Sequence, residues 1–423
     1  MTNTDSPYNS PSYRRYVLGM LTAAYAFNFI DRQLITILQE SIKQDLALSD
    51  TQLGLLTGFA FAVFYVCAGI PIARWSDKGN RRNIIALAIG VWSFMTAISG
   101  ACTSYIQMLL ARIGVGIGES GGTPPAHSII SDIYPEQQRA TALSIYSLGI
   151  NIGVMFGFFL GGVINEFFGW RWAFVVVGAP GILMAIIIKM TIVEPPRGWS
   201  DPTPVNQEKS FSLKDVIQLL ASHPVLKQFL MGASIFSIGG YGAFNWLAPF
   251  FIRSHDLNTA SLGLWLSLSI GLFGGIGTYL AGVITDKLGV FNKAWYLWIP
   301  ALSGVLAAPL YVLILTTEST SLALWVNFIP SMLLATYIGP GVAVLHANVP
   351  AAMRATVSAL FYFLINIIGL GLGPTLIGAL SDYLTPSMGS DALSTAMLWI
   401  IPIATCWGGI HFYIAGTRLG KAS

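Results

Sequence analysis

The sequence predicts an all-α membrane protein of twelve transmembrane helices in two six-helix bundles, from its composition, its apolar segments and an internal repeat. Of the 423 residues, 54% are apolar and only 10% are charged, whereas an average soluble domain has about 25% charged residues. So few charges cannot cover the surface of a water-soluble protein of this size. A net charge of +3 without a basic cluster also argues against a nucleic-acid partner.

Apolar segments long enough to cross a bilayer, which takes about 20 residues in a helix, follow one another along the chain. Charged residues and turn-forming residues such as Gly79, Asn80 and Pro135 separate them. We expect spans at 16–39, 52–75, 83–102, 105–131, 140–165, 171–192, 226–252, 260–285, 294–317, 321–348, 355–380 and 392–415.

Lysine and arginine predict how these spans are oriented. With the N-terminus inside, 17 of them lie on the inner side and 3 on the outer side, namely Lys43, Arg171 and Arg253. Cytoplasmic loops carry the excess of Lys and Arg in membrane proteins. We therefore expect a multi-pass protein of the plasma (inner) membrane, surrounded by the lipid bilayer, with both termini in the cytoplasm.

A polar segment at 194–224 divides the spans into two sets of six. It begins Glu194-Pro195-Pro196-Arg197 and contains Pro202 and Pro204. From Ser212, a plausible N-cap, to Leu220 it has the pattern of a short amphipathic helix, which we expect along the membrane surface. The predicted domains are a bundle at 1–193, a cytoplasmic linker at 194–224 and a bundle at 225–423.

The two halves carry an internal repeat. Arg139-Ala140-Thr141 recurs 215 residues later as Arg354-Ala355-Thr356, and the same spacing joins Pro135 to Pro350 and Asn151 to Asn366. Asp77-Lys78 after the second span is matched by Asp286-Lys287 after the eighth. Parallel repeats of six spans are typical of alternating-access carriers. An ion channel is less well supported, because no filter-like loop is visible.

Several motifs resemble signatures of the major facilitator superfamily. They are the loop at 73–82 (Ala-Arg-Trp-Ser-Asp-Lys-Gly-Asn-Arg-Arg), its echo at 282–289, and Arg112, Gly116 and Gly118 in the fourth span. The resemblance covers essentially the whole chain and implies the major facilitator fold. In the fifth span Gly153, Gly157 and Gly161 are spaced by four, which allows another helix to approach closely.

Within that superfamily, the sequence looks like the spinster branch. The residues that carry this resemblance are 28–32 (Asn-Phe-Ile-Asp-Arg), 116–119 (Gly-Ile-Gly-Glu) and 129–134 (Ile-Ile-Ser-Asp-Ile-Tyr). Spinster proteins move lysolipids and sphingoid phosphates, so the resemblance implies a lipid-like cargo. The stretch at 121–125 (Gly-Gly-Thr-Pro-Pro) is also similar to organic anion:cation symporters.

Four charged residues lie deep inside the predicted spans: Asp31 and Arg32 in the first, and Arg112 and Glu119 in the fourth. Such charges are costly in hydrocarbon, so we expect them to face a cavity and to pair. Arg112 and Glu119 are seven residues apart and share one helix face. We predict a network in which the two carboxylates exchange protons and switch arginine partners. A permanent structural ion pair is the alternative.

Other candidate residues surround this network. Asn28 and His127 are near it in sequence, and His127 can titrate near neutral pH, as can His346 in the matching region of the tenth span. The second half contributes hydroxyl and aromatic groups to the predicted cavity wall. They are Ser234, Ser237, Tyr241, Asn245 and Trp246 of the seventh span and Tyr337 of the tenth. Ordinary packing explains any single one of these equally well.

Charged residues at the inner span ends form a predicted cytoplasmic gate. In the family, an Asp at the position of Asp77 caps a helix of the opposite bundle, where the helix dipole favours an anion. The gate residues are Asp77, Lys78, Arg81, Arg82, Arg139, Asp286, Lys287 and Arg354. For Arg81 and Arg82, the positive-inside rule alone is an adequate explanation.

The sequence therefore predicts a secondary carrier that moves an anionic, lipid-like amphiphile together with protons. No Walker-type, HExxH or GxSxG motif occurs, so ATP-driven transport and hydrolysis lack support. We expect a monomer that is not an enzyme and has no cofactor or metal. A proton-coupled symporter of small organic anions is the alternative within carriers, and a lipid-binding scaffold without flux is the alternative of another class.

Overall fold

The structure is a computed structural model that describes residues 6–200, 212–350 and 353–422, and within these residues all regular structure is helical. The prediction of an all-α membrane protein is confirmed. Pro202 and Pro204 of the predicted linker lie outside the described residues. The described chain forms two compact units that differ from the predicted domains in two short segments.

The first unit contains the described residues within Met1–Leu46, Val63–Asn206 and Thr259–Leu264. Its helices are η2 (Pro7–Asn9), α1 (Pro11–Leu46), most of α3 (Ala60–Lys78), α4 (Arg81–Ser99), α5 (Tyr105–Glu119), α6 (Thr123–Ile133), α7 (Glu136–Phe168), α8 (Trp170–Thr191) and most of α11 (Thr259–Leu266).

The second unit contains the described residues within Ala47–Ala62, Gln207–Asn258 and Trp265–Ser423. Its helices are α2 (Asp50–Gly54), η3 (Leu55–Phe59), α9 (Leu213–Ser222), α10 (Pro224–His255), η4 (Ser267–Phe273), α12 (Gly274–Gly289), α13 (Trp295–Thr316), α14 (Thr320–Val326), α15 (Phe328–Leu334), α16 (Ile338–Ala347), α17 (Arg354–Leu364), η6 (Ile365–Leu372), α18 (Gly373–Met388), η7 (Gly389–Asp391) and α19 (Ala392–Ala422).

Each predicted span coincides with one helix or with consecutive helices. Nine helical stretches of the described chain are long and apolar enough to cross a membrane, and the last, Thr356–Lys421, contains two predicted spans. The first and fourth predicted spans, formed by α1 and by α5 with α6, are not among these nine. Three spans contain π-helical segments, η3, η4 and η6, of which the sequence pattern gives no sign.

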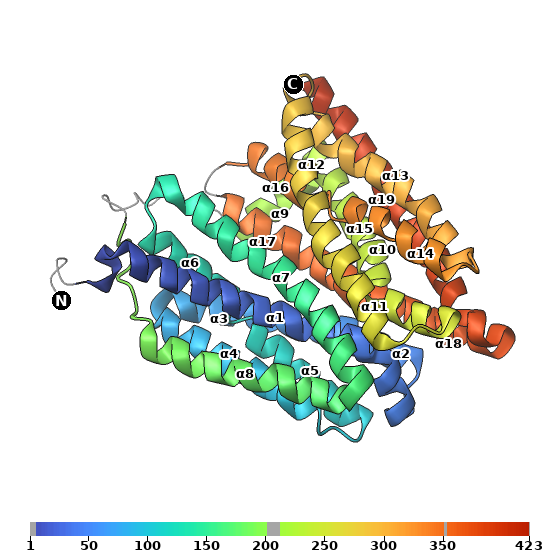
Figure 1. Cartoon of the computed structure of the whole chain (residues 1–423). Helices are drawn as coiled ribbons and strands as arrows, with labels where there is room; N and C mark the ends of the chain where they lie inside the picture. Colours follow the sequence, from blue (N-terminus) through green and yellow to red (C-terminus); the bar gives the residue numbers. More distant parts are fainter. Residues whose placement is uncertain (1–5, 201–211, 351–352, 423) are drawn as a thin grey trace. The chain divides into compact units, whose positions relative to one another are not determined.

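Within the first unit, the glycines of α7 allow a close contact with α1. A Cβ atom on Gly153 would lie 2.4 Å from the Ala26 carbonyl oxygen, and one on Gly157 would lie 2.6 Å from the Gln33 Cβ. Figure 1 shows α1 and α7 running side by side, as this spacing requires. The predicted role of the row of glycines in close packing is confirmed.

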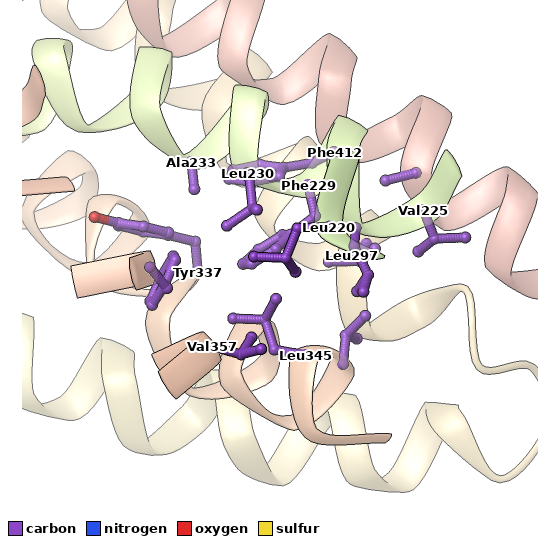
Figure 2. Packing of buried hydrophobic residues seen from close by; sticks show 14 of the residues in the cluster. Leu220, Val225, Phe229, Leu230, Ala233, Leu297, Tyr337, Leu345, Val357 and Phe412 are labelled. Carbon is purple, nitrogen blue, oxygen red and sulfur yellow. The ribbon is translucent and has the colours of Figure 1, made fainter. Parts of the chain in front are cut away.

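The second unit has an apolar core to which α9 contributes. Ser212 is the N-cap of α9 and forms a capping box with Asp215, as the sequence suggested for the start of this helix. Figure 2 shows Leu220 of α9 among Val225, Phe229 and Leu230 of α10. The apolar face of α9 thus packs against protein, and its predicted place along the membrane surface stays a prediction.

Candidate functional site

The predicted charge network lies within the first unit and is almost completely enclosed. Asp31, Arg112 and Glu119 are only 2%, 2% and 1% exposed. Helix α1 carries Asp31 and Arg32, and α5 carries Arg112 and Glu119. The two turns between Arg112 and Glu119 place both on one side of α5, and α1 and α5 together bring the four ionisable groups to one region.

The clearest contact in this network joins Arg32 to Glu119. The Arg32 Nε donates to Glu119 Oε2 at 2.6 Å. The Arg32 guanidinium also lies 4.9 Å from the centre of the Phe29 ring and 4.8 Å from that of Tyr65, distances at which an aromatic face attracts a cation. Asn28 donates a further hydrogen bond to Glu119. Arg32 is therefore held by one carboxylate and two rings.

Asp31 has a different partner, which the sequence analysis missed. Thr96 of α4 donates its hydroxyl to Asp31 Oδ2 at 3.1 Å. The other oxygen of each acid, Asp31 Oδ1 and Glu119 Oε1, is buried without a hydrogen-bond partner among the described residues. Both acids lie within electrostatic range of Arg112. An unpaired carboxylate oxygen is costly to bury, and protonation is one way to lower that cost.

Asn28 contacts the network directly, whereas His127 packs against aromatic rings of the first unit. The His127 ring meets the Tyr146 ring edge-on at 5.2 Å, and Tyr146 stacks on Tyr25 at 4.4 Å. Tyr25, Asn28, Trp92 and Tyr146 line a small hollow in the first unit. His346 belongs to the second unit, where it contacts Ser358 at 2.7 Å, so the two histidines have unlike surroundings.

A second charge network of the first unit is centred on Arg81. This side chain is fully buried and donates to Glu194 Oε1 at 2.7 Å, and to Asp132. It also donates to Ser128 Oγ at 2.8 Å and to the Pro195 carbonyl at 2.7 Å. The positive-inside rule therefore does not account for Arg81: a cation at a membrane face has no need of burial against two acids.

Comparisons with known proteins decide the family. The profile of the Major Facilitator Superfamily matches residues 21–413. The chain belongs to the Major Facilitator Superfamily.

This transporter is similar to proteins of the spinster branch. A crystal structure of a bacterial homolog to the human lysosomal transporter Spinster, inward-facing and unoccupied, superposes with a TM-score of 0.87 at 32% identity, covering 98% of each chain. The Sphingosine-1-phosphate transporter SPNS2 of Danio rerio is 25% identical over 417 residues, which is 93% of this chain and 82% of that protein.

A bacterial relative is similar over nearly the same length. The MFS-type efflux pump of Mycolicibacterium smegmatis is 29% identical over 401 residues, covering 95% of this chain and 92% of the relative. The predictions of a spinster-like transporter and of the major facilitator fold are thus confirmed.

Four of the predicted cavity residues in the second half of this transporter, Ser234, Ser237, Asn245 and Trp246, donate hydrogen bonds to carbonyls of the second unit. Ser234 and Ser237 donate to carbonyls of their own helix, each at 2.8 Å. The amide of Asn245 donates to the Tyr241 carbonyl at 2.9 Å, and the Trp246 indole to that of Pro374 at 2.9 Å. Tyr337 is buried against Phe236, with ring centres 5.1 Å apart. Their cavity role stays a prediction.

The remaining predicted gate residues are less enclosed than Arg81. Asp77, Lys78 and Lys287 are exposed. Asp286, also exposed, accepts from the Tyr296 hydroxyl at 2.7 Å. The Arg82 backbone donates to Glu194 Oε2 at 2.8 Å, Arg139 lies 3.5 Å from Ser200 Oγ, and Arg354 donates to the His346 carbonyl at 3.2 Å.

Two buried ion-pair clusters of this transporter were not predicted from the sequence. One is the pair of acids that contact Arg81, Asp132 and Glu194. Asp132 lies in the motif 129–134, which carries the spinster resemblance, and Glu194 begins the predicted linker. The other lies in the second unit, where Asp50 is buried and accepts two hydrogen bonds of 2.8 Å from Arg253. No pattern marked Asp50, because it stands next to a polar turn at the start of a span.

Proposed function

We propose that this protein is a secondary active transporter that moves an anionic, lipid-like amphiphile of the lysolipid or sphingoid-phosphate type by alternating access, with proton linkage. The Arg32–Glu119 contact carries the proposal. It holds a half-buried arginine, which suits an anionic head group, against a buried carboxylate that can release it by taking up a proton.

The proton step follows from the partners of the two acids. When Glu119 is ionised it holds Arg32, and when it is protonated this attraction is lost and Arg32 can bind an anion instead. Asp31 and Arg112 supply the second carboxylate and the second arginine, so a proton on either acid changes which pairs form. A permanent ion pair between α1 and α5 would give no such exchange.

The similarity to a sphingosine-1-phosphate transporter supports the cargo class, as does the apolar and aromatic character of α10. In this proposal Asn28 and His127 belong to the proton and substrate network. The cavity of the cargo-binding state is lined by Ser234, Ser237, Tyr241, Asn245, Trp246 and Tyr337.

The other parts of the mechanism complete the proposal. A cytoplasmic linker at 194–224 joins the two bundles. The protein lies in the plasma (inner) membrane with both termini on the cytoplasmic side, and it works as a monomer. Asp77, Lys78, Arg81, Arg82, Arg139, Asp286, Lys287 and Arg354 act as the cytoplasmic gate.

Proteoliposome flux tests the cargo. Under a pH gradient, we expect uptake of a lysophospholipid or sphingoid phosphate to exceed that of a small carboxylate such as a sugar acid. Faster carboxylate flux would favour the symporter of small organic anions. A protein that binds the lipid without moving either cargo would be a scaffold, and the proposal would be wrong.

The variants Asp31→Asn and Glu119→Gln test the proton step. Each removes a charge of the network at nearly constant volume, so we expect pH-driven flux to fall by about tenfold or more, since a hydrogen bond to a charged group contributes about 1.5–3 kcal/mol. The pH dependence of conformational exchange should weaken in both. Asp391→Asn, at an exposed acid of η7, is the control. An unaltered pH response in both variants would exclude the proton role.

A further inference from the structure

A carboxylate of the second unit caps the start of the helix that begins at α2. Asp382 of α18 accepts from the backbone N–H groups of Asp50 and Thr51, at 3.0 and 2.8 Å, and from the Thr51 hydroxyl at 2.6 Å. An anion at this place is stabilised by unpaired N–H groups and by the helix dipole. Next to it, Ser381 donates to Asp50 at 2.6 Å, which ties the same turn to α18 a second time.

A carboxylate of the first unit likewise caps the N-terminal turn of α11. Glu166 of α7 accepts from the backbone N–H of Thr259 at 3.0 Å and from its hydroxyl at 2.9 Å. Asn165 donates to that hydroxyl at 3.1 Å. The backbones also approach closely, because a Cβ atom on Gly263 would lie 2.5 Å from the Phe158 carbonyl oxygen.

These two caps are related by the internal repeat. Thr259 follows Asp50 by 209 residues, which is also the spacing between Asp77 and Asp286. Asp382 follows Glu166 by 216 residues, one more than the 215 that relates the fifth and eleventh spans. Each half of the chain therefore provides one capping acid, at the end of its fifth span, and one capped turn, at the start of its second span.

Each capped turn packs with one unit while the rest of its helical stretch belongs to the other. The segment Ala47–Ala62 is part of the second unit, whereas the chain that continues it, from Val63, is part of the first. The segment Thr259–Leu264 is part of the first unit, and its continuation from Trp265 is part of the second.

A π-helical segment adjoins each change of unit. The segment η3 ends at Phe59, three residues before the chain passes from the second unit to the first after Ala62. The segment η4 begins at Ser267, two residues after the chain passes from the first unit to the second at Trp265. Such segments alter the hydrogen-bond register of a helix and are frequent at functional sites. Each capped turn is therefore followed by a stretch of irregular helix.

We propose that the Asp382 and Glu166 caps are a matched pair of latches that stabilise one end state of transport and must open to reach the other. The inference rests on the proposed alternating access. By the predicted topology the caps lie on the outer side, so closed latches favour the state that is closed to the outside. Asp382 is the stronger latch, because the buried Asp50–Arg253 ion pair reinforces its turn and no ion pair contacts Thr259 among the described residues.

The test uses Asp382→Ala, Glu166→Ala and the double variant of the full chain. Pairs of spin labels replace Ala101 and Glu318 on the outer side and Lys189 and Val290 on the inner side, all exposed and none of them a proposed gate residue, in a background with Cys67, Cys102 and Cys406 replaced by alanine. Double electron–electron resonance then measures the outer and the inner distance distributions in the purified protein, without cargo or a pH gradient.

We expect each single variant to shift the ratio of the two states by about fivefold, the usual effect of losing a cap, and the double variant to shift it further. The outer distance should lengthen while the inner distance shortens. Asp382→Asn, which keeps one acceptor oxygen, should have a smaller effect, and Asp391→Ala, at an exposed acid of the same unit, should have none.

Opposite changes at the two faces separate a latch from a purely structural cap. A double variant that is folded, with a lower melting temperature and both distributions unchanged, would overturn the inference. Because these distances are measured without cargo, this outcome is independent of the flux experiment. Lysolipid transport together with unchanged distances would refute only the latch proposal. Changed distances without lysolipid flux would refute only the proposed cargo.

Discussion

Two adjacent arginines, Arg81 and Arg82, show how much a single position determines. Both stand at the start of α4 and both count toward the inner-side charge, but Arg81 is fully buried against Asp132 and Glu194. Arg82 is half-buried, and its contact with Glu194 is made by the backbone. The positive-inside rule describes the second residue and not the first.

The variant Arg81→Gln should be strongly destabilising, since it leaves two acids without their buried cation. Breaking a buried ion pair by removing one partner costs about 3–5 kcal/mol. We expect a clear fall in the melting temperature of the purified protein. Arg82→Gln is the matched control and should cost about 1 kcal/mol or less, because the backbone contact with Glu194 remains. Equal melting temperatures for the two variants would contradict the assignment of Arg81.

At the scale of elements, the row of glycines on α7 connects sequence to packing most directly. The spacing of four in the sequence predicted a close approach but did not name the partner helix. The structure supplies α1, whose backbone at Ala26 faces Gly153. The π-helical segments are the opposite case, because nothing in the apolar pattern of 55–59 or 267–273 distinguishes them from ordinary helix.

Gly153→Ala tests this packing. Its Cβ would meet backbone atoms, which cannot rotate away, so α1 and α7 must separate at a cost of about 1–3 kcal/mol or more. We expect a lower melting temperature and a lower yield of monodisperse protein. The control is Gly19→Ala on α1, where a Cβ meets nothing within 4 Å, and which should be neutral or slightly stabilising. If Gly19→Ala proved as harmful as Gly153→Ala, close packing would not be the cause.

At the scale of the whole molecule, the charge distribution predicts orientation. With 17 Lys and Arg residues on one side and 3 on the other, the bias is strong enough to fix the topology of a chain with an even number of spans. The helical spans of the structure agree in order and approximate bounds with those predicted.

Reporter fusions measure that orientation. Green fluorescent protein attached after Ser423 should fluoresce, because it folds in the cytoplasm, whereas alkaline phosphatase attached there should be inactive. A fusion in the turn after His255 should show the reverse. Phosphatase activity at the C-terminus would contradict the predicted topology.

The sequence by itself determined the class of protein, the number and order of its spans, its family resemblance and the four charges in the central network. These follow from local properties: a bilayer requires a long apolar segment wherever the chain crosses it, and a charge within such a segment is evident without knowledge of its neighbours.

Only the tertiary structure decided the partners: Thr96 for Asp31, Asp132 and Glu194 for Arg81, Arg253 for Asp50, and Asp382 for the turn at α2. These residues are 51 to 332 positions apart in the chain. Their pairing depends on which helices lie side by side and in which rotation, and that is set by the packing of whole helical faces, to which no single residue pattern corresponds.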